Sequence, residues 1–100
     1  MASPYMLSEE LLTAIQKHEI GIAEALISQG ADVNYETLQG NTPLTFAIQA
    51  NDMEMIKLLL KNGADAWKEV RTLMGGSINA INFARYAVRN EALARFLEYS

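Results

Sequence analysis

Apolar residues recur at helical spacing in short blocks along the chain, and the clearest block lies in its middle. Its positions follow i, i+3, i+4 spacing and share one helix face: Leu44, Ala47 and Ile48. Thr42 and Pro43 come directly before them. A Thr hydroxyl can accept hydrogen bonds from the first turn, and Pro suits the first helical position because it has no N–H to satisfy. The pattern predicts a helix over about 43–50.

A second helix is predicted over about 53–61, where a broad apolar face includes the run 58–60. Between the two helices, Asn51 tolerates the left-handed backbone that ends a helix, and Asp52 can begin the next one. Gly63 follows as a C-terminal stop. Two helices this short cannot each bury an apolar face alone. They need neighbours on both sides.

The same arrangement occurs earlier in the chain at a constant spacing of 33 residues. Eight positions are identical between the two copies: Leu11, Ala14, Ile15, Gln16, Leu26, Gly30, Ala31 and Asp32 recur as Leu44, Ala47, Ile48, Gln49, Leu59, Gly63, Ala64 and Asp65. A weaker third copy appears if four residues are inserted, with these pairings: Phe46-Ala47 with Phe83-Ala84, Glu54 with Glu91, and Leu59-Leu60 with Phe96-Leu97. A fixed period near this length is typical of a stacked solenoid.

The residues of the middle copy resemble the ankyrin repeat. The segment 40–47 matches the family's Gly-x-Thr-Pro-Leu-His-x-Ala signature, except that Thr45 stands where His is usual. Gly30-Ala31-Asp32 and Gly63-Ala64-Asp65 also fit the pattern, and the resemblance extends over roughly 8–99. It implies L-shaped units, each with two antiparallel helices and a β-hairpin finger that projects sideways. Family members are overwhelmingly protein-binding scaffolds.

The expected fold is therefore all-α: an ankyrin-repeat solenoid with three stacked helix pairs and two β-hairpin fingers. We expect a single domain over 1–100, with repeats at about 8–34, 40–67 and 77–99. In the first repeat, Ser8 is the expected N-cap of a helix that runs to about Lys17. The second helix of that repeat is expected over 20–28, and the third pair over 79–87 and 90–99.

Two arginines in the third repeat indicate that it is a C-terminal cap. In the alignment of the repeats, Arg85 replaces Ile48 and Arg95 replaces Leu58, at positions expected to face a following repeat. Charges there need partners if they are buried, so we expect no further repeat to stack on this one. Val88 falls on a left-handed turn position that a β-branched residue resists, and the turn is expected to shift to 89–90.

Composition and charge argue against nucleic acid and membranes as partners. The 100 residues carry a net charge of −4 with both signs interspersed, whereas a nucleic-acid-binding domain usually has a basic face. The absence of cysteine is compatible with a reducing compartment, and we expect a cytoplasmic protein. No apolar run approaches the length of a membrane span, and no secretory leader is visible.

Candidate catalytic groups are sparse. His18 is the only histidine, and it falls on the turn position of Asn51, where ending a helix is the simpler role. The segment 75–77 lacks the spacing and the Lys of a phosphate-binding loop. The acidic pairs Glu9-Glu10 and Asp52-Glu54 are ordinary helix-start residues. We therefore expect no enzyme activity, no metal and no cofactor.

The expected function is non-catalytic protein–protein interaction, by a chain that is monomeric when free. The interaction could mask or inhibit the partner protein. The alternative is a structural module that forms oligomers, and a less favoured one is an enzyme. By the resemblance, the partner would contact the concave face and the fingers, at these residues: Lys17, Tyr35, Leu38, Asn41, Gln49, Trp67, Arg71, Met74 and Tyr86.

The second finger is four residues longer than the first. Trp67 either packs beneath this longer loop or joins the binding surface. Aromatic, Met and Arg side chains are enriched at interfaces, so Arg71 and Met74 support direct contact between this finger and a partner. Tyr35 and Leu38 of the first finger are expected to be exposed near its tip at 37–39.

Overall fold

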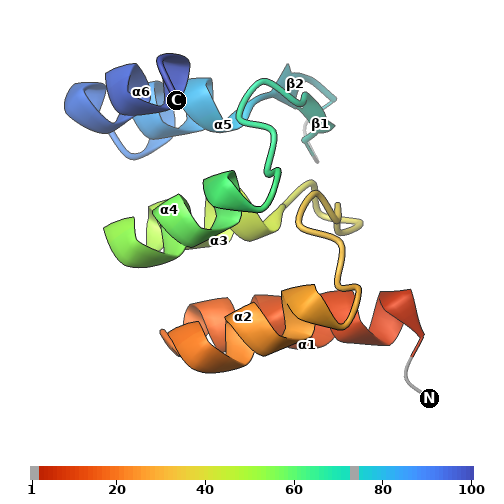
Figure 1. Ribbon diagram of the computed structural model, residues 1–100. Coiled ribbons are helices and arrows are strands. Elements are labelled where there is room, and N and C mark those ends of the chain that lie inside the picture. The colour runs from red at the N-terminus through yellow and green to blue at the C-terminus, as the bar shows by residue number, and fades with distance from the viewer. Residues whose placement is uncertain (1–2, 73–74) are drawn as a thin grey trace.

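The computed structural model describes residues 3–72 and 75–100. Three antiparallel helix pairs are stacked in layers, and the connecting fingers project from one side of the stack (Figure 1). The elements in chain order are α1 (Pro4–Gln16), α2 (Ile20–Ser28), α3 (Pro43–Gln49), α4 (Met53–Lys61), β1 (Val70–Arg71), β2 (Ser77–Ile78), α5 (Ala80–Asn82), the π-helix η1 (Phe83–Ala87) and α6 (Glu91–Glu98).

The middle repeat begins and ends as its residues predict. The Thr42 side chain accepts a hydrogen bond from Thr45 N, and the Thr45 hydroxyl accepts one from Thr42 N at 2.8 Å, so that the two residues form a reciprocal capping box. Thr45 thus closes the helix start at the position where the family usually has His. Asn51 has the expected left-handed backbone, and Asp52 caps α4 by accepting from Met55 N.

One apolar core runs through all three layers. The first helices of the pairs stack on one another, α1 on α3 and α3 on α5, and α2 contacts α4. The largest fully buried apolar side chains come from every layer: Leu11, Ile15, Leu44, Ile48, Met55, Ile56, Leu59, Ile81 and Leu97. Burial of apolar area between layers is the main stabilising term in such a stack.

The start of the first helix differs from the prediction. Ser3 is the N-cap, Pro4 is the first helical residue, and Ser8 lies buried inside α1. The Ser8 hydroxyl donates to Pro4 O at 2.7 Å and accepts from Asp32 N at 2.9 Å. Ser8 therefore does not cap its own helix. It accepts a hydrogen bond from a backbone N–H at the start of the first finger. Without Ser8, this N–H would face α1 with no acceptor.

A side chain of the first finger links the first two repeats. Asn34 donates from Nδ2 to Gly63 O at 3.0 Å and accepts at Oδ1 from Asp65 N at 2.7 Å. Each Asp also folds its own finger, since Asp32 Oδ1 accepts from Asn34 N and Asp65 Oδ1 accepts from Trp67 N. The second Gly-Ala-Asp motif, at 63–65, is thus a point where the first finger is tied to the second layer.

The residues that flank the two finger tips make the same hydrogen bonds. In the first, Gly40 N donates to Thr37 O, and the Thr37 hydroxyl accepts from Asn41 N at 3.0 Å. In the second, Gly75 N donates to Thr72 O, and the Thr72 hydroxyl accepts from Gly76 N. Gly40 and Gly75 both have positive φ angles, at 81° and 94°. The first tip lies where the sequence predicted it.

The four extra residues of the second finger lengthen its two arms equally. Two lie between Asp65 and the turn at Thr72, and two lie between Gly75 and the N-cap Asn79. The longer arms form the antiparallel pair β1–β2, with Val70 opposite Ile78. The described residues of the first finger form turns and no strand. Two β-hairpin fingers are therefore not confirmed, because only the longer finger has strand pairing.

The third repeat carries one further extra residue, which the sequence alignment missed. The N-caps Thr42 and Asp52 lie 10 residues apart, whereas Asn79 and Asn90 lie 11 apart. The helix absorbs the difference by widening to the π-helix η1, where Val88 N donates to Phe83 O. An inserted residue is a usual cause of such a π-bulge.

The turn after η1 shifts as predicted, since Arg89 rather than Val88 has a positive φ, at 60°. Asn90 then takes the place of Asp52, and Leu93, Ala94 and Leu97 take the buried places of these residues: Met55, Ile56 and Leu59. The equivalence of Arg95 with Leu58 is therefore wrong by one position. Arg95 corresponds to Lys57 and is exposed.

Candidate protein-binding surface

The first helices of the three pairs present equivalent exposed positions, one above another. Gln16, Gln49 and Tyr86 share one position in the repeat, and all three are exposed. The next position is also exposed in every layer, at Lys17, Ala50 and Ala87. Since α1 stacks on α3 and α3 on α5, and η1 directly follows α5, we group these exposed residues as one surface, which we call the inner face. It contains three of the predicted contact residues: Lys17, Gln49 and Tyr86.

The inner face becomes more apolar toward the third repeat. Tyr86 is 69% exposed, in the row where the earlier repeats have glutamine. Phe46 and Phe83 are half-buried and pack against the core from equivalent positions, where the first repeat has Thr13. Sequence reasoning did not select either Phe as a contact residue. The occurrence of Phe at the same position in two repeats was the sequence signal that could have identified them.

The finger residues lie in different environments. Leu38 at the first tip is 96% exposed, as predicted. Asn41 is half-buried, and Arg71 is exposed on β1. The two fingers touch closely, because a Cβ placed on Gly40 would lie only 1.9 Å from Arg71 O. Arg71 and Leu38 are therefore held on adjoining fingers, while Met74 lies outside the described residues.

Tyr35 is not fully exposed, contrary to the prediction. It is half-buried against Tyr5, with the two rings edge to face and their centroids 5.9 Å apart. A hydrogen bond to Glu9, burial and the neighbouring Tyr5 raise the pKa of Tyr35 above its ordinary value. The N-terminal turns of α1 thus brace the first finger, and Tyr35 contributes to this brace.

Trp67 lies apart from the inner face. Its side chain is 60% exposed, so packing beneath the longer finger is wrong. It lines a cavity of about 170 Å³ together with Leu60 of α4 and Leu97 of α6. These are second helices of their pairs, whereas the inner face is built from first helices. A partner on the inner face would therefore not reach Trp67 through that face alone.

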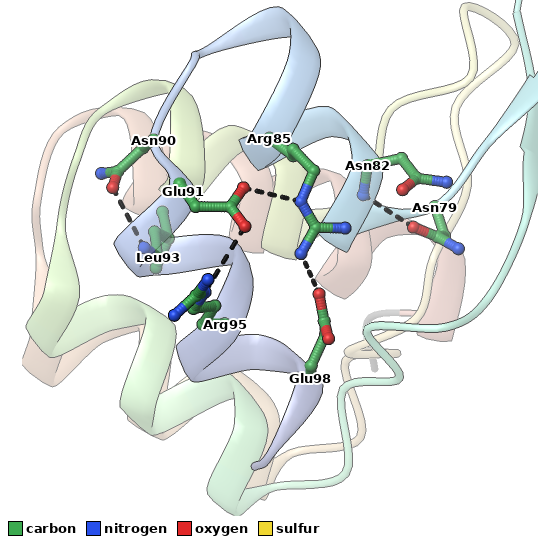
Figure 2. Close-up of polar contacts among 8 residues, drawn as sticks. All are labelled: Asn79, Asn82, Arg85, Asn90, Glu91, Leu93, Arg95 and Glu98. Carbon is green, nitrogen blue, oxygen red and sulfur yellow. Dashed lines mark hydrogen bonds and ion pairs between the residues drawn. The ribbon is translucent and has the colours of Figure 1, made fainter.

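A network of charged side chains closes the third helix pair (Figure 2). Arg85 Nε donates to Glu91 Oε2 at 2.7 Å, and its Nη2 donates to Glu98. Arg95 Nε lies 3.5 Å from the other oxygen of Glu91. The hydrogen bond from Arg85 is the main cause that holds the pKa of Glu91 below its ordinary value.

Arg85 replaces the buried Ile48, and its guanidinium finds the partners that a charge at such a position needs.

Among residues 3–72 and 75–100, no three His, Cys, Asp or Glu side chains gather as metal ligands. None of the described helices has the length and apolar character to cross a bilayer. His18 has the left-handed backbone expected of its turn position, at a φ of 57°, and its ring pairs with the buried Asp52 of the next repeat.

Comparison with known proteins agrees with this architecture. A family model described as ankyrin repeats (3 copies) matches residues 10–70. The human 2-5A-dependent ribonuclease is 36% identical over 56 residues, which are 55% of this chain and 8% of that protein. The potassium channel AKT2/3 of Arabidopsis thaliana is 32% identical over 65 residues, 65% of this chain and 8% of the channel.

A third relative is viral. The putative ankyrin repeat protein FPV233 of fowlpox virus is 43% identical over 53 residues, 52% of this chain and 10% of that protein. The chain spans a tenth or less of the length of these three relatives. Ankyrin repeats generally mediate protein–protein interaction and are typically non-catalytic. Since the family match covers more than half of its residues, the chain belongs to the ankyrin-repeat family.

Proposed function

We propose that the protein binds one partner protein through its inner face and the adjoining finger tips, as a monomer and without catalysing a reaction. The observation that carries this proposal is that the stacked first helices and η1 present exposed residues at equivalent positions, among them the aromatic side chain of Tyr86. Tyrosine is enriched at binding hot spots because it brings a large contact area with few rotamers to immobilise.

The rigidity of the stack supports the same proposal. The helix pairs share one core, the layers are tied by Asn34, and the fingers touch at Gly40. A surface that is ordered before binding loses less conformational entropy in the complex. Leu38 and Arg71 extend this surface beyond the helices.

The experiment is affinity capture from the native source, identification of the captured protein by mass spectrometry, and titration calorimetry with the purified partner. Tyr86→Ala and Gln49→Ala remove contacts from the inner face. Tyr99→Ala and Gln29→Ala are matched controls, because they remove the same exposed residue types from the ends of second helices.

We expect Tyr86→Ala to weaken binding at least about fivefold, which corresponds to about 1 kcal/mol. The two controls should bind as tightly as the unmodified protein. An affinity loss with Tyr99→Ala and none with Tyr86→Ala would move the contact surface to the second helices and refute the proposal.

A further inference from the structure

The junction between the first two repeats contains an ionisable pair that the other junction lacks. His18 ends the first helix of repeat one, and its Nδ1 is hydrogen-bonded to Asp52 Oδ2 in repeat two. The equivalent residues at the next junction are Asn51 and Asn90. Within the described residues, no side-chain hydrogen bond joins that pair of amides.

Asp52 uses its two oxygens for two different tasks. Oδ1 accepts from Met55 N at 3.2 Å and caps α4, while Oδ2 contacts the His18 ring. The Asp52 side chain is only 7% exposed, whereas that of His18 is 61% exposed. The carboxylate is therefore fixed by the fold, and the imidazole can exchange protons with solvent.

The backbone of His18 also holds the ring at this place. The left-handed conformation is uncommon for residues other than Gly, and Asn, Asp and His adopt it more readily than most. The turn is closed by hydrogen bonds from His18 N to Ile15 O and from Glu19 N to Ala14 O. The same residue thus ends α1 and reaches across to the next layer.

We propose that His18 and Asp52 form a proton-dependent latch, which holds the first repeat on the second more firmly in mildly acidic than in alkaline solution. The latch takes only a proton as its ligand and acts without a partner protein. It links the two layers that carry Lys17 and Gln49 of the inner face.

The direction of the effect follows from the charges around the ring. The hydrogen bond to Asp52 and then the negative charge of Asp52 raise the pKa of His18 above its ordinary value of about 6.5, and Glu54 adds a smaller contribution. Lys17 and Glu19 flank the ring along the chain. Protonated His18 is therefore favoured in the folded state.

The raised pKa determines the pH window. Stabilisation by the pair is fully present below about pH 6.5, the value for an unfolded chain, and is lost as pH rises through the folded-state pKa. The neutral ring can still donate its Nδ1 hydrogen, so the junction weakens at high pH without opening completely.

The test uses the full chain and needs no binding partner. Because the protein has a single histidine, its imidazole signal in an NMR titration needs no assignment. We expect this signal to titrate above pH 6.5 in the unmodified protein and to move down in Asp52→Asn, which keeps a capping oxygen but removes the charge. Glu54→Gln is the matched control, and it should lower the pKa less than Asp52→Asn.

Equilibrium unfolding in urea at pH 6 and pH 8.5 measures the effect of the pair on folding stability. His18→Asn keeps a residue that tolerates the left-handed turn and removes the titrating group. The unfolding equilibrium constant of the unmodified protein should rise between the two pH values relative to that of His18→Asn. This relative rise should approach, without exceeding, the ratio of the acid constant in the unfolded state to that in the folded state.

Two results would overturn the latch. One is a His18 signal that titrates at or below pH 6.5. The other is an unfolding constant with the same pH dependence in the unmodified protein and in His18→Asn. The second measurement stands even if Asp52→Asn does not fold, because it uses a variant with an intact helix cap.

Discussion

Truncation of Leu59 tests the assignment of the core most sharply, because its two neighbours are also leucines. Leu59 is fully buried, whereas Leu58 and Leu60 on either side are half-buried at the surface of the same helix. Leu59→Ala removes three carbons from a closed environment. At about 0.8 kcal/mol for each buried carbon, the lost transfer energy alone is about 2.4 kcal/mol.

The cavity left behind adds to this cost, since the surrounding layers relax only partly. Leu-to-Ala changes in well-packed cores cost roughly 2.7–5.0 kcal/mol in all, and we expect Leu59→Ala to fall within that range. Small domains typically have a total stability of about 5–15 kcal/mol. The variant should therefore melt at least about 10 °C below the unmodified protein, since about 4–8 °C is lost per kcal/mol at this chain length.

Urea unfolding monitored by circular dichroism measures the free energy of each variant. Leu58→Ala and Leu60→Ala are the matched controls, and each should cost clearly less than Leu59→Ala because its side chain is partly solvated before truncation. A cost for Leu59→Ala below about 1 kcal/mol, or one no larger than the costs of both neighbours, would contradict the helix face assigned here.

Three further variants test other parts of the structure by the same unfolding measurement. Gly40→Ala should destabilise strongly, because φ is +81° and the new Cβ would meet Arg71 O at 1.9 Å; Gly30→Ala, at φ +113° in open space, should cost less. Ser8→Ala should cost about 1–3 kcal/mol, since it leaves Asp32 N without its acceptor; a cost near zero would contradict that role. Arg85→Gln should make the free energy of unfolding less sensitive to acid. The lowered pKa of Glu91 gives stability that is present above the pKa of the unfolded state and lost as pH falls through the pKa of the folded state. An unchanged dependence on acid would refute this linkage.

Local chemistry made the middle repeat predictable. The residues that begin its two helices act on the first turn that follows them, so their roles as helix starts follow from the sequence. They are Thr42 and Pro43 for α3 and Asp52 for α4. The left-handed residue Asn51 and the shift of the last turn to Arg89 follow in the same way. Such short-range hydrogen bonds and backbone preferences need no knowledge of the rest of the fold.

The errors lie where distant residues decide the outcome. Ser3 and Ser8 both precede plausible first turns, and the contact of Ser8 with Asp32 favours the earlier start. No residue type marks the insertion in η1, so only the spacing between the two N-caps of the third repeat reveals it. The exposure of Trp67 depends on which elements cover it, and its own residue type does not reveal this.

The proposed binding surface is similarly divided. The spacing of the repeat brings Lys17, Gln49 and Tyr86 onto one face, because equivalent positions of stacked helices must face the same way. The fingers could not be placed so simply. Tyr35 packs on Tyr5 from an extension of α1 that the repeat pattern does not contain.

The most direct test of the account is a footprint of the captured partner on the protein, measured as amide chemical-shift changes in the two-dimensional NMR spectrum. We expect the largest changes on α3, η1 and the first finger tip around Leu38. The spectrum of the second helices α2, α4 and α6 should change little. Changes concentrated on those second helices, with the inner face unaffected, would contradict it.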